Sequence, residues 1–214
     1  MHPEPMAHVL LRIAADARLE CAGAAPDWMA PALARAPWVV VRRAPARDGL
    51  IPVGVRGPRR AQRLAAWLDP GAVLERITPP QLAARRAWVG RPRSTRLAPL
   101  LALDAIERLM RAQRLTWGPC GSVGFELASS VATVTADSDL DLVVEIRRAL
   151  PVAVARTLLA ACRALPVRID VQLEGPQGAV ALGEYACGRT PLVLRTPTGP
   201  RLVRDPWTAA PAAA

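Results

Sequence analysis

Lysine is absent from this sequence of 214 residues, and all 28 basic residues are arginine. A chain without lysine cannot form a Schiff base, a Ser–Lys dyad or a phosphate loop that depends on lysine. A GC-rich genome, which favours Arg, Ala, Pro and Gly codons, accounts for this composition. Its chemical effect is nevertheless definite, because any bound anion must meet guanidinium groups or backbone N–H groups.

Histidine, aromatic residues and long apolar runs are also scarce. The two histidines, His2 and His8, lie at the extreme N-terminus, so a nucleophile activated by histidine is not expected. The four cysteines lack C-x-x-C spacing, which excludes a zinc site or redox pair of that kind and favours reduced, mostly buried thiols in a cytoplasmic protein. No apolar run approaches the roughly 18 residues of a membrane helix, and the N-terminus does not resemble a signal peptide, so no membrane partner is expected.

Positive charge is concentrated in the first half of the chain. Residues 1–100 contain 16 Arg and 7 acidic residues, whereas residues 101–214 contain 12 Arg and 11 acidic residues. This asymmetry indicates an acidic partner, a polyphosphate or a nucleic acid, and the alternative is a solubilising face. The few aromatic residues do not alternate with Arg as they do in a base-stacking platform, so we expect no nucleic-acid partner.

The order of expected elements indicates an α+β protein. The apolar runs 37–41 and 51–55 flank a turn at Arg47-Asp48-Gly49 and predict a hairpin in a small N-terminal domain that contains β-structure. The Gly90-Arg91-Pro92-Arg93-Ser94 segment is typical of a linker, so we expect domains at 1–90 and 91–208 and a disordered Ala-Pro tail at 209–214. Helices are predicted at 61–68, 81–88, 97–115, 125–130, 151–165 and 177–187, and further strands at 139–146, 167–173, 192–195 and 202–204.

Paired carboxylates open the predicted strand 139–146. Asp139 and Asp141 are two residues apart, so on a strand they point to the same side, while Leu140 and Leu142 point into the core. Two carboxylates on one face repel each other unless a cation neutralises them, and their hard oxygen atoms suit Mg²⁺. The alternative is a solvated strand face.

An isolated carboxylate, Asp170, lies in the apolar strand 167–173. If this strand lies beside the Asp139 strand, three carboxylates converge. Three acids with two Mg²⁺ ions form the arrangement that catalyses phosphoryl or nucleotidyl transfer. The alternative for Asp170 is a salt bridge with an arginine on an edge strand.

A turn with glycine precedes these acids. Gly121 allows the backbone to approach a phosphate closely, and Ser122, at an expected helix start, offers its hydroxyl and N–H groups to the same phosphate. The alternative for Ser122 is a helix cap. The Gly-Ser turn, the Asp-x-Asp pair and the later strand Asp together are a stronger signal than any one of them.

The order of these motifs resembles nucleotidyltransferases of the DNA polymerase beta type. More closely, the runs 121–128 and 138–142 resemble the malonate decarboxylase holo-acyl-carrier-protein synthases, also called phosphoribosyl-dephospho-CoA transferases. The runs 37–43 and 51–57 resemble the first domain of that family, so the resemblance spans about residues 35–205. The gap between Ser122 and Asp139 is longer than in many other nucleotidyltransferases, which leaves open the loop that covers the substrate.

The resemblance implies a mixed-sheet nucleotidyltransferase domain with flanking helices. It implies a reaction in which a serine of the apo acyl-carrier subunit of malonate decarboxylase attacks the α-phosphorus of 2′-(5″-triphosphoribosyl)-3′-dephospho-CoA and releases pyrophosphate. The nucleophile then belongs to the partner protein, which explains why this chain needs no catalytic histidine.

The resemblance also implies the roles of individual residues. Asp139 and Asp141 would bind Mg²⁺, and Asp170 would complete the metal site and help to deprotonate the serine. Gly121 and Ser122 would hold the triphosphate. Because lysine is absent, arginines must neutralise the remaining charge, and Arg189 and Arg195 are expected to do so from their position late in this domain.

Two other functions are compatible with the sequence. The same chemistry would serve another hydroxyl acceptor with an ordinary nucleoside triphosphate as donor. A non-catalytic, Arg-rich module that binds nucleic acid is also compatible with the charge of residues 1–100.

Overall fold

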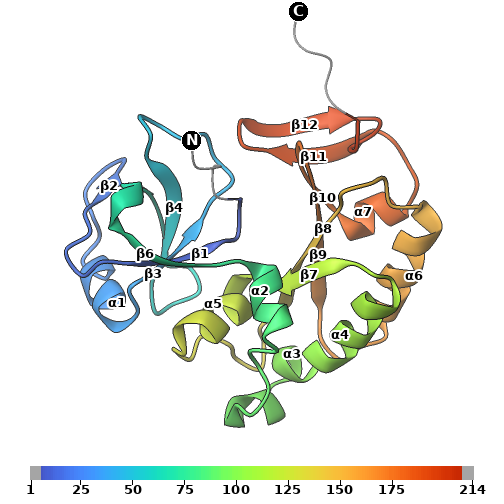
Figure 1. The fold of residues 1–214 in the computed structure, drawn as a ribbon, viewed down its shortest axis with the longest axis horizontal. Coiled ribbons are helices and arrows are strands. Elements are labelled where there is room, and N and C mark those ends of the chain that lie inside the picture. Colours follow the sequence, from blue (N-terminus) through green and yellow to red (C-terminus); the bar gives the residue numbers. More distant parts are fainter. Residues whose placement is uncertain (1–5, 209–214) are drawn as a thin grey trace, which may run out of the picture.

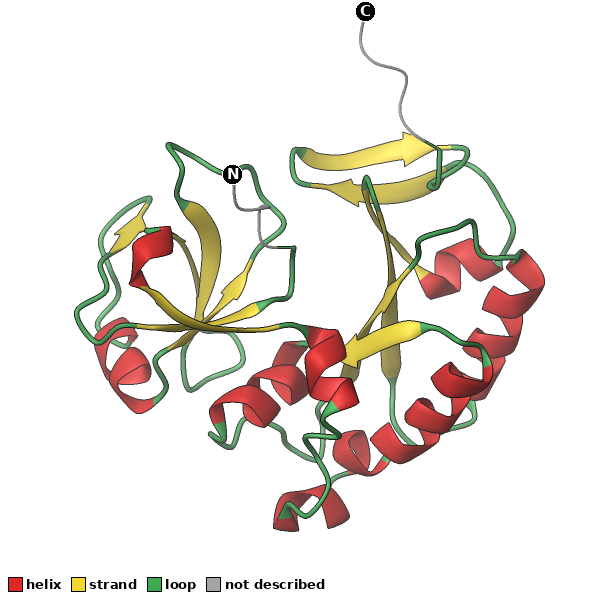
Figure 2. Ribbon diagram, viewed as in Figure 1, coloured by secondary structure: helices red, strands yellow, loops and turns green. Residues whose placement is uncertain are grey.

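Two six-stranded sheets make up the computed structural model, which describes residues 6–208 (Figures 1 and 2). The first sheet is antiparallel and has the strand order β2-β5-β4-β3-β1-β6. Its strands are β1 (Leu10–Ile13), β2 (Leu19–Cys21), β3 (Trp38–Val41), β4 (Ile51–Arg56), β5 (Arg63–Leu68) and β6 (Val73–Ile77). Helix α1 (Met29–Arg35) and the short 3₁₀ helix η1 (Pro70–Ala72) complete this part of the chain. We call the part that ends with β6 the first half, and the part that follows β6 the second half.

The second sheet is mixed and has the strand order β12-β11-β10-β9-β8-β7. Strands β8 and β9 are parallel, and the other neighbours are antiparallel. The strands are β7 (Thr116–Pro119), β8 (Leu140–Glu145), β9 (Ile169–Gly175), β10 (Gly178–Ala181), β11 (Leu192–Thr196) and β12 (Gly199–Val203). The expected α+β class, with a first half that contains β-structure and a second half built on a mixed sheet, is confirmed.

Helices cover the second sheet on the side turned away from the first sheet, where Figure 1 shows α4, α6 and α7. The helices after β6 are α2 (Pro79–Ala84), η2 (Pro92–Thr95), α3 (Ala98–Leu101), α4 (Leu103–Ala112), α5 (Gly121–Ser129), α6 (Val152–Arg163) and α7 (Leu182–Ala186). Helix α6 makes the crossover between the parallel strands β8 and β9. Within residues 6–208, no helix combines the length and apolar character needed to cross a membrane.

Two hydrophobic cores support this architecture. The smaller core lies within the first half and includes Leu11 and Val39. The larger core belongs to the second half, yet it also takes in Leu10 and Trp38 from the same two strands, β1 and β3. Since neighbouring side chains on a strand face opposite sides, one face of the first sheet packs on its own core and the other packs against the second half. The two halves therefore share apolar contacts.

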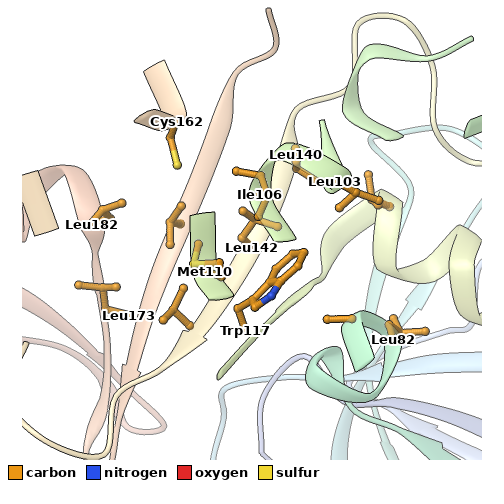
Figure 3. Close-up of a cluster of buried hydrophobic side chains, with 14 of the residues drawn as sticks. Leu82, Leu103, Ile106, Met110, Trp117, Leu140, Leu142, Cys162, Leu173 and Leu182 are labelled. Carbon is orange, nitrogen blue, oxygen red and sulfur yellow. The ribbon is translucent and has the colours of Figure 1, made fainter. Parts of the chain in front are cut away.

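The larger core fixes the direction of the β8 side chains. Leu140 and Leu142 are fully buried and lie with Ile106 and Met110 of α4 in the cluster of Figure 3. The alternate residues of β8 must then point to the opposite face of the sheet. The expectation that Leu140 and Leu142 point into the core is confirmed.

Several sequence-based element predictions are confirmed. The hairpin forms, with Val40 paired to Gly54 across β3 and β4. Helix α6 and strand β9 lie within two residues of their expected bounds. The predicted helix 97–115 is divided into α3 and α4.

Other predictions are wrong. The predicted helix 61–68 is instead strand β5, because pairing with β4 and β2 outweighs the helix propensity of its Leu and Ala residues. The predicted helix 177–187 begins with strand β10, and only Leu182–Ala186 is helical. Strands β1, β2, β6 and β7 and helix α1 were not expected. The tail at 209–214 lies outside the described residues.

Gly118 allows α2 to pack against β7. A Cβ atom at this position would lie 1.9 Å from the carbonyl carbon and oxygen of Pro79, which are backbone atoms. Strand β7 leads directly into Gly121, so the close contact with α2 fixes the start of α5.

Glu126 of α5 anchors the segment that follows this helix. Its side chain is 5% exposed, and its carboxylate accepts hydrogen bonds from the N–H groups of Thr133 and Val134, at 2.7 Å each, and from Arg93 Nε at 2.8 Å. Burial alone would raise the pKa of Glu126, but these hydrogen bonds outweigh burial and lower the pKa. Glu126 thus fixes the loop between α5 and β8.

We predict that Gly118→Ala destabilises the protein by about 1–3 kcal/mol or more, as overpacking against immovable backbone does. Gly183→Ala is the matched control, because no atom lies within 4 Å of the added Cβ and Gly183 is helical. The control should be neutral or slightly stabilising. Urea unfolding compares the two variants, and equal stability of both would contradict the packing argument.

Glu126→Gln is expected to lose about 1–3 kcal/mol of stability at neutral pH, because a buried charged acceptor is removed. The pKa of Glu126 is lowered from its ordinary value of 4.5, so its contribution is present above pH 4.5 and is lost as pH falls through the lower folded-state pKa. The difference between wild type and variant should therefore shrink on acidification. Urea unfolding at several pH values checks this, with Glu75→Gln, which removes a half-exposed ion pair, as the control. A pH-independent difference would be evidence against it.

Candidate active site

Asp141 and Asp170 lie side by side on the parallel strands β8 and β9. They are direct register partners, and adjacent strands are about 4.8 Å apart. Asp139 immediately precedes β8 and is two residues from Asp141. The fold therefore brings the three predicted carboxylates to one end of this strand pair. Since β9 lies between β8 and β10, Asp170 is not on an edge strand.

Electrostatic repulsion is strongest at Asp141. Burial raises its pKa, and the charges of Asp170 and Asp139 raise it further, while Arg60 and Arg168 lower it. Both outer carboxylates are therefore within electrostatic reach of Asp141. The central carboxylate lacks full compensation from the protein, which is the condition that a bound cation relieves.

The three carboxylate groups do not lie close enough together to form one cluster. Asp139 Oδ2 lies 3.3 Å from Arg60 Nη2, and Asp170 Oδ2 lies 3.3 Å from Arg168 Nη2. Each outer carboxylate thus turns toward an arginine. Across residues 6–208, no three His, Cys, Asp or Glu side chains are grouped closely enough to hold one metal ion.

Gly121 begins α5 directly against the central carboxylate. Its φ is +58°, and a Cβ at this position would lie 2.0 Å from Asp141 Oδ2. Only glycine satisfies both the left-handed backbone and the close approach. Cys120 is the N-cap and makes no side-chain cap, so the helix start leaves backbone N–H groups available beside the acids.

Ser122 is the second residue of α5 and therefore does not act as the helix N-cap. Its carbonyl accepts a hydrogen bond from Thr133 Oγ1 at 2.9 Å, which joins the helix start to the anchored loop. Gly121, Ser122, Asp139 and Asp141 all line a cavity of about 590 Å³, which we call the catalytic cavity.

Three arginines from the first half form the opposite wall of the catalytic cavity. They are Arg56 at the end of β4, Arg60 in the following turn, and Arg63 at the start of β5. Burial and the nearby charges of Arg63 and Arg60 lower the pKa of Arg56 to about 10. Its guanidinium lies 5.9 Å from the centre of the Phe125 ring. This wall presents concentrated positive charge to an anion in the cavity.

Sequence reasoning missed this arginine wall. The signal was the Arg56–Arg63 run itself, in which four arginines occur within eight residues. The expected anion-binding residues were instead Arg189 and Arg195. Arg189 is exposed in the loop after α7 and is not in the lining of the catalytic cavity. Arg195 lies on β11 and donates a hydrogen bond to Gln172 at 2.8 Å.

Arg195 belongs to a neighbouring cavity that also touches the carboxylates. This cavity, about 650 Å³ in volume, is lined by Asp141, Asp170, Arg163, Arg168 and Arg195 among others. Asp141 is the residue that lines both cavities. Asp141 therefore has one cavity on the side of Gly121 and another on the side of Asp170.

His8 also lines the catalytic cavity, which the sequence did not predict. Its φ is +72°, a conformation that non-glycine residues rarely adopt. Burial lowers the pKa of His8, Glu174 raises it and Arg43 lowers it. The imidazole is therefore neutral near pH 7.

All four cysteines are free thiols, with Cys120 and Cys162 buried and Cys187 exposed.

Comparison with known proteins matches this chain to one family along nearly its whole length. The family models described as phosphoribosyl-dephospho-CoA transferase MdcG N-terminal domain and C-terminal domain match residues 6–79 and 82–206. No solved structure matches the chain.

Curated relatives agree with the family models. A protein named phosphoribosyl-dephospho-CoA transferase from Azotobacter vinelandii is 44% identical over 207 residues, which are 95% of this chain and 94% of the relative. Relatives with the same name are 42% identical in Pseudomonas aeruginosa, covering 97% and 95% of the two chains, and 42% identical in Pseudomonas putida, covering 86% of each. This chain therefore belongs to the phosphoribosyl-dephospho-CoA transferase family.

Proposed function

We propose that this chain transfers the 2′-(5″-triphosphoribosyl)-3′-dephospho-CoA prosthetic group to a serine of the apo acyl-carrier subunit of malonate decarboxylase, with release of pyrophosphate. The observation that carries the proposal is the catalytic cavity. Its lining combines acidic residues, three arginines and the start of helix α5 at Gly121. A bound triphosphate needs cationic groups to neutralise its charge and backbone N–H groups to orient it, and this cavity offers both.

Asp139, Asp141 and Asp170 are proposed to hold Mg²⁺, as two ions. Their oxygen donors suit this hard cation, and the charges of Asp170 and Asp139, which add to burial in raising the pKa of Asp141, are charges that a cation would neutralise. Bound Mg²⁺ supplies Lewis-acid stabilisation of charge on phosphate oxygens. Arg60 and Arg168, which now contact Asp139 and Asp170, would release these carboxylates toward the ions and become free to contact phosphate.

The remaining residues are assigned by their place around the carboxylates. The N–H groups at Gly121 and Ser122, together with Arg56, Arg60 and Arg63, would hold the β- and γ-phosphates that leave as pyrophosphate. The incoming serine would then approach from the Asp170 side, where Arg195 lies. The serine oxygen forms the new bond to the α-phosphorus, the bond to the pyrophosphate oxygen breaks, and Asp170 receives the hydroxyl proton.

The proposal extends to the organisation of the protein. We infer a division of the chain at 90/91, with the first unit supplying the arginine wall and the second supplying the carboxylates. The partners are then the donor and the apo carrier protein, and a cytoplasmic location agrees with the free thiols. The names of the relatives favour this donor over an ordinary nucleoside triphosphate.

The direct test is mass spectrometry of apo carrier protein after incubation with donor and Mg²⁺. Wild type should increase the carrier mass by the prosthetic group, and Asp141→Asn should lower the transfer rate at least about 100-fold, because several kcal/mol of transition-state charge stabilisation is lost.

Asp16→Asn, an exposed position between β1 and β2, controls for the loss of one negative charge and should retain the wild-type rate. Circular dichroism checks that the fold survives. A wild-type rate from Asp141→Asn would refute the carboxylate assignment. Labelling of the carrier from ATP but not from the triphosphoribosyl donor would favour the other nucleotidyltransferase function.

Arg56→Gln should raise the KM for the donor by about 10-fold or more, because a charge-assisted contact to phosphate is worth about 1.5–3 kcal/mol. Inhibition by inorganic triphosphate should weaken in parallel. The control is Arg35→Gln, which changes the last turn of α1 on the exposed side of the first half. If Arg56→Gln leaves both the KM for the donor and the inhibition constant of triphosphate unchanged, the arginine wall does not bind the triphosphate.

A further inference from the structure

A second and larger cavity adjoins the catalytic cavity along the junction of the two halves. Its volume is about 820 Å³, within the usual range for small-molecule sites. Neighbouring positions on β3 and β4 connect the two cavities: Val40 and Gly54 line the catalytic cavity, while Arg42 and Pro52 line the second one. At the N-terminus, His8 lines the first and Ala7 lines the second. We call the second cavity the distal cavity.

The second half places the two cavities at opposite ends of β8. Asp141 lines the catalytic cavity and Glu145 lines the distal cavity. Four residues of strand span about 13 Å. A ligand anchored at the carboxylates therefore reaches the distal cavity if it continues along the junction past His8.

An ion pair that joins the halves lies in the lining of the distal cavity. The Arg43 guanidinium donates two hydrogen bonds to the Glu174 carboxylate, at 2.5 and 2.6 Å, and both side chains are largely buried. Arg43 is thereby occupied. This pair fixes the spacing of the two walls, so the distal cavity is formed before any ligand binds.

The distal cavity combines positive charge with an apolar surface. Within residues 6–208, neither Arg42 nor Arg76 forms a salt bridge, and the nearest carboxylate oxygen to Arg147 is that of Glu145 at 3.7 Å. The apolar lining comes from Leu50, Ile51, Pro52, Pro70 and Ile146. This combination suits a ligand that has both an anionic group and an uncharged, flexible arm.

We propose that the distal cavity binds the diphosphate and pantetheine arm of the donor's CoA moiety. The inference rests on the proposed function, which places the donor's triphosphate in the catalytic cavity. In that donor, two pentose rings separate the α-phosphorus from the CoA diphosphate, and the pantetheine arm extends beyond it. Arg42, Arg76 and Arg147 would contact the diphosphate, and the apolar lining would contact the arm.

Equilibrium titration calorimetry tests the subsite with two probes, 3′-dephospho-CoA and inorganic triphosphate. Arg42→Gln and Ala46→Trp, which fills the distal cavity from an exposed loop position, should each weaken binding of 3′-dephospho-CoA by about 10-fold or more. Both variants should bind triphosphate as wild type does. Arg56→Gln should show the reverse pattern.

Adenosine diphosphate, which lacks the pantetheine arm, separates the two parts of the subsite. Ala46→Trp should weaken 3′-dephospho-CoA more than adenosine diphosphate, whereas Arg42→Gln should weaken both. Unchanged affinity for 3′-dephospho-CoA in both variants, or a parallel loss of triphosphate binding, would overturn the assignment. If the two variants weaken binding of the apo carrier protein and not of 3′-dephospho-CoA, the assignment is also overturned.

The binding experiment is independent of catalysis. If wild type fails to modify the carrier protein but the two variants still lose 3′-dephospho-CoA selectively, the proposed function is wrong and the subsite stands. If transfer occurs but the variants bind 3′-dephospho-CoA normally, the proposed function stands and the subsite is wrong.

Discussion

The repulsion among carboxylates at the start of β8 and β9 is the constraint on which the site depends. Parallel pairing places Asp141 beside Asp170, and the two-residue period of the strand adds Asp139. The strands that carry these carboxylates are fixed in place because their opposite faces are buried in the larger core. The hydrophobic packing of Leu140, Leu142 and Leu173 thus holds three like charges in place.

The absence of lysine gives the site its particular character. A lysine reaches one phosphate oxygen as a flexible point charge, whereas an arginine presents a planar fork that contacts two. Three such forks face the carboxylates, and burial together with their mutual repulsion lowers the pKa of Arg56. The cavity therefore has opposed acidic and basic walls. A cation and a polyanion are complementary to those walls.

The orientation of each carboxylate could be predicted from the sequence because strand alternation is local, whereas the proximity of Asp170 to Asp141 depends on the pairing of β8 with β9. Alternation along 139–146 and 167–173 is sufficient to orient Asp139, Asp141 and Asp170. The arginine wall could not be predicted, since Arg56 meets Asp141 only through the packing of two halves far apart in the chain. Strand β5 was mistaken for a helix for the same reason, because its Ala and Leu residues favour a helix until β4 and β2 pair with it. Which roles these residues perform stays a prediction.

The acidic and basic walls lie in different halves, which the Arg43–Glu174 ion pair joins, and this arrangement has a consequence for how such a protein can evolve. The acids lie in one half and the facing arginines in the other, so each half alone has a charged surface without its counterpart. A gene fragment that encodes either half would carry only one wall of the catalytic cavity. Selection must therefore act on the two halves as one inherited unit, and substitutions at their junction are constrained even where no substrate is touched.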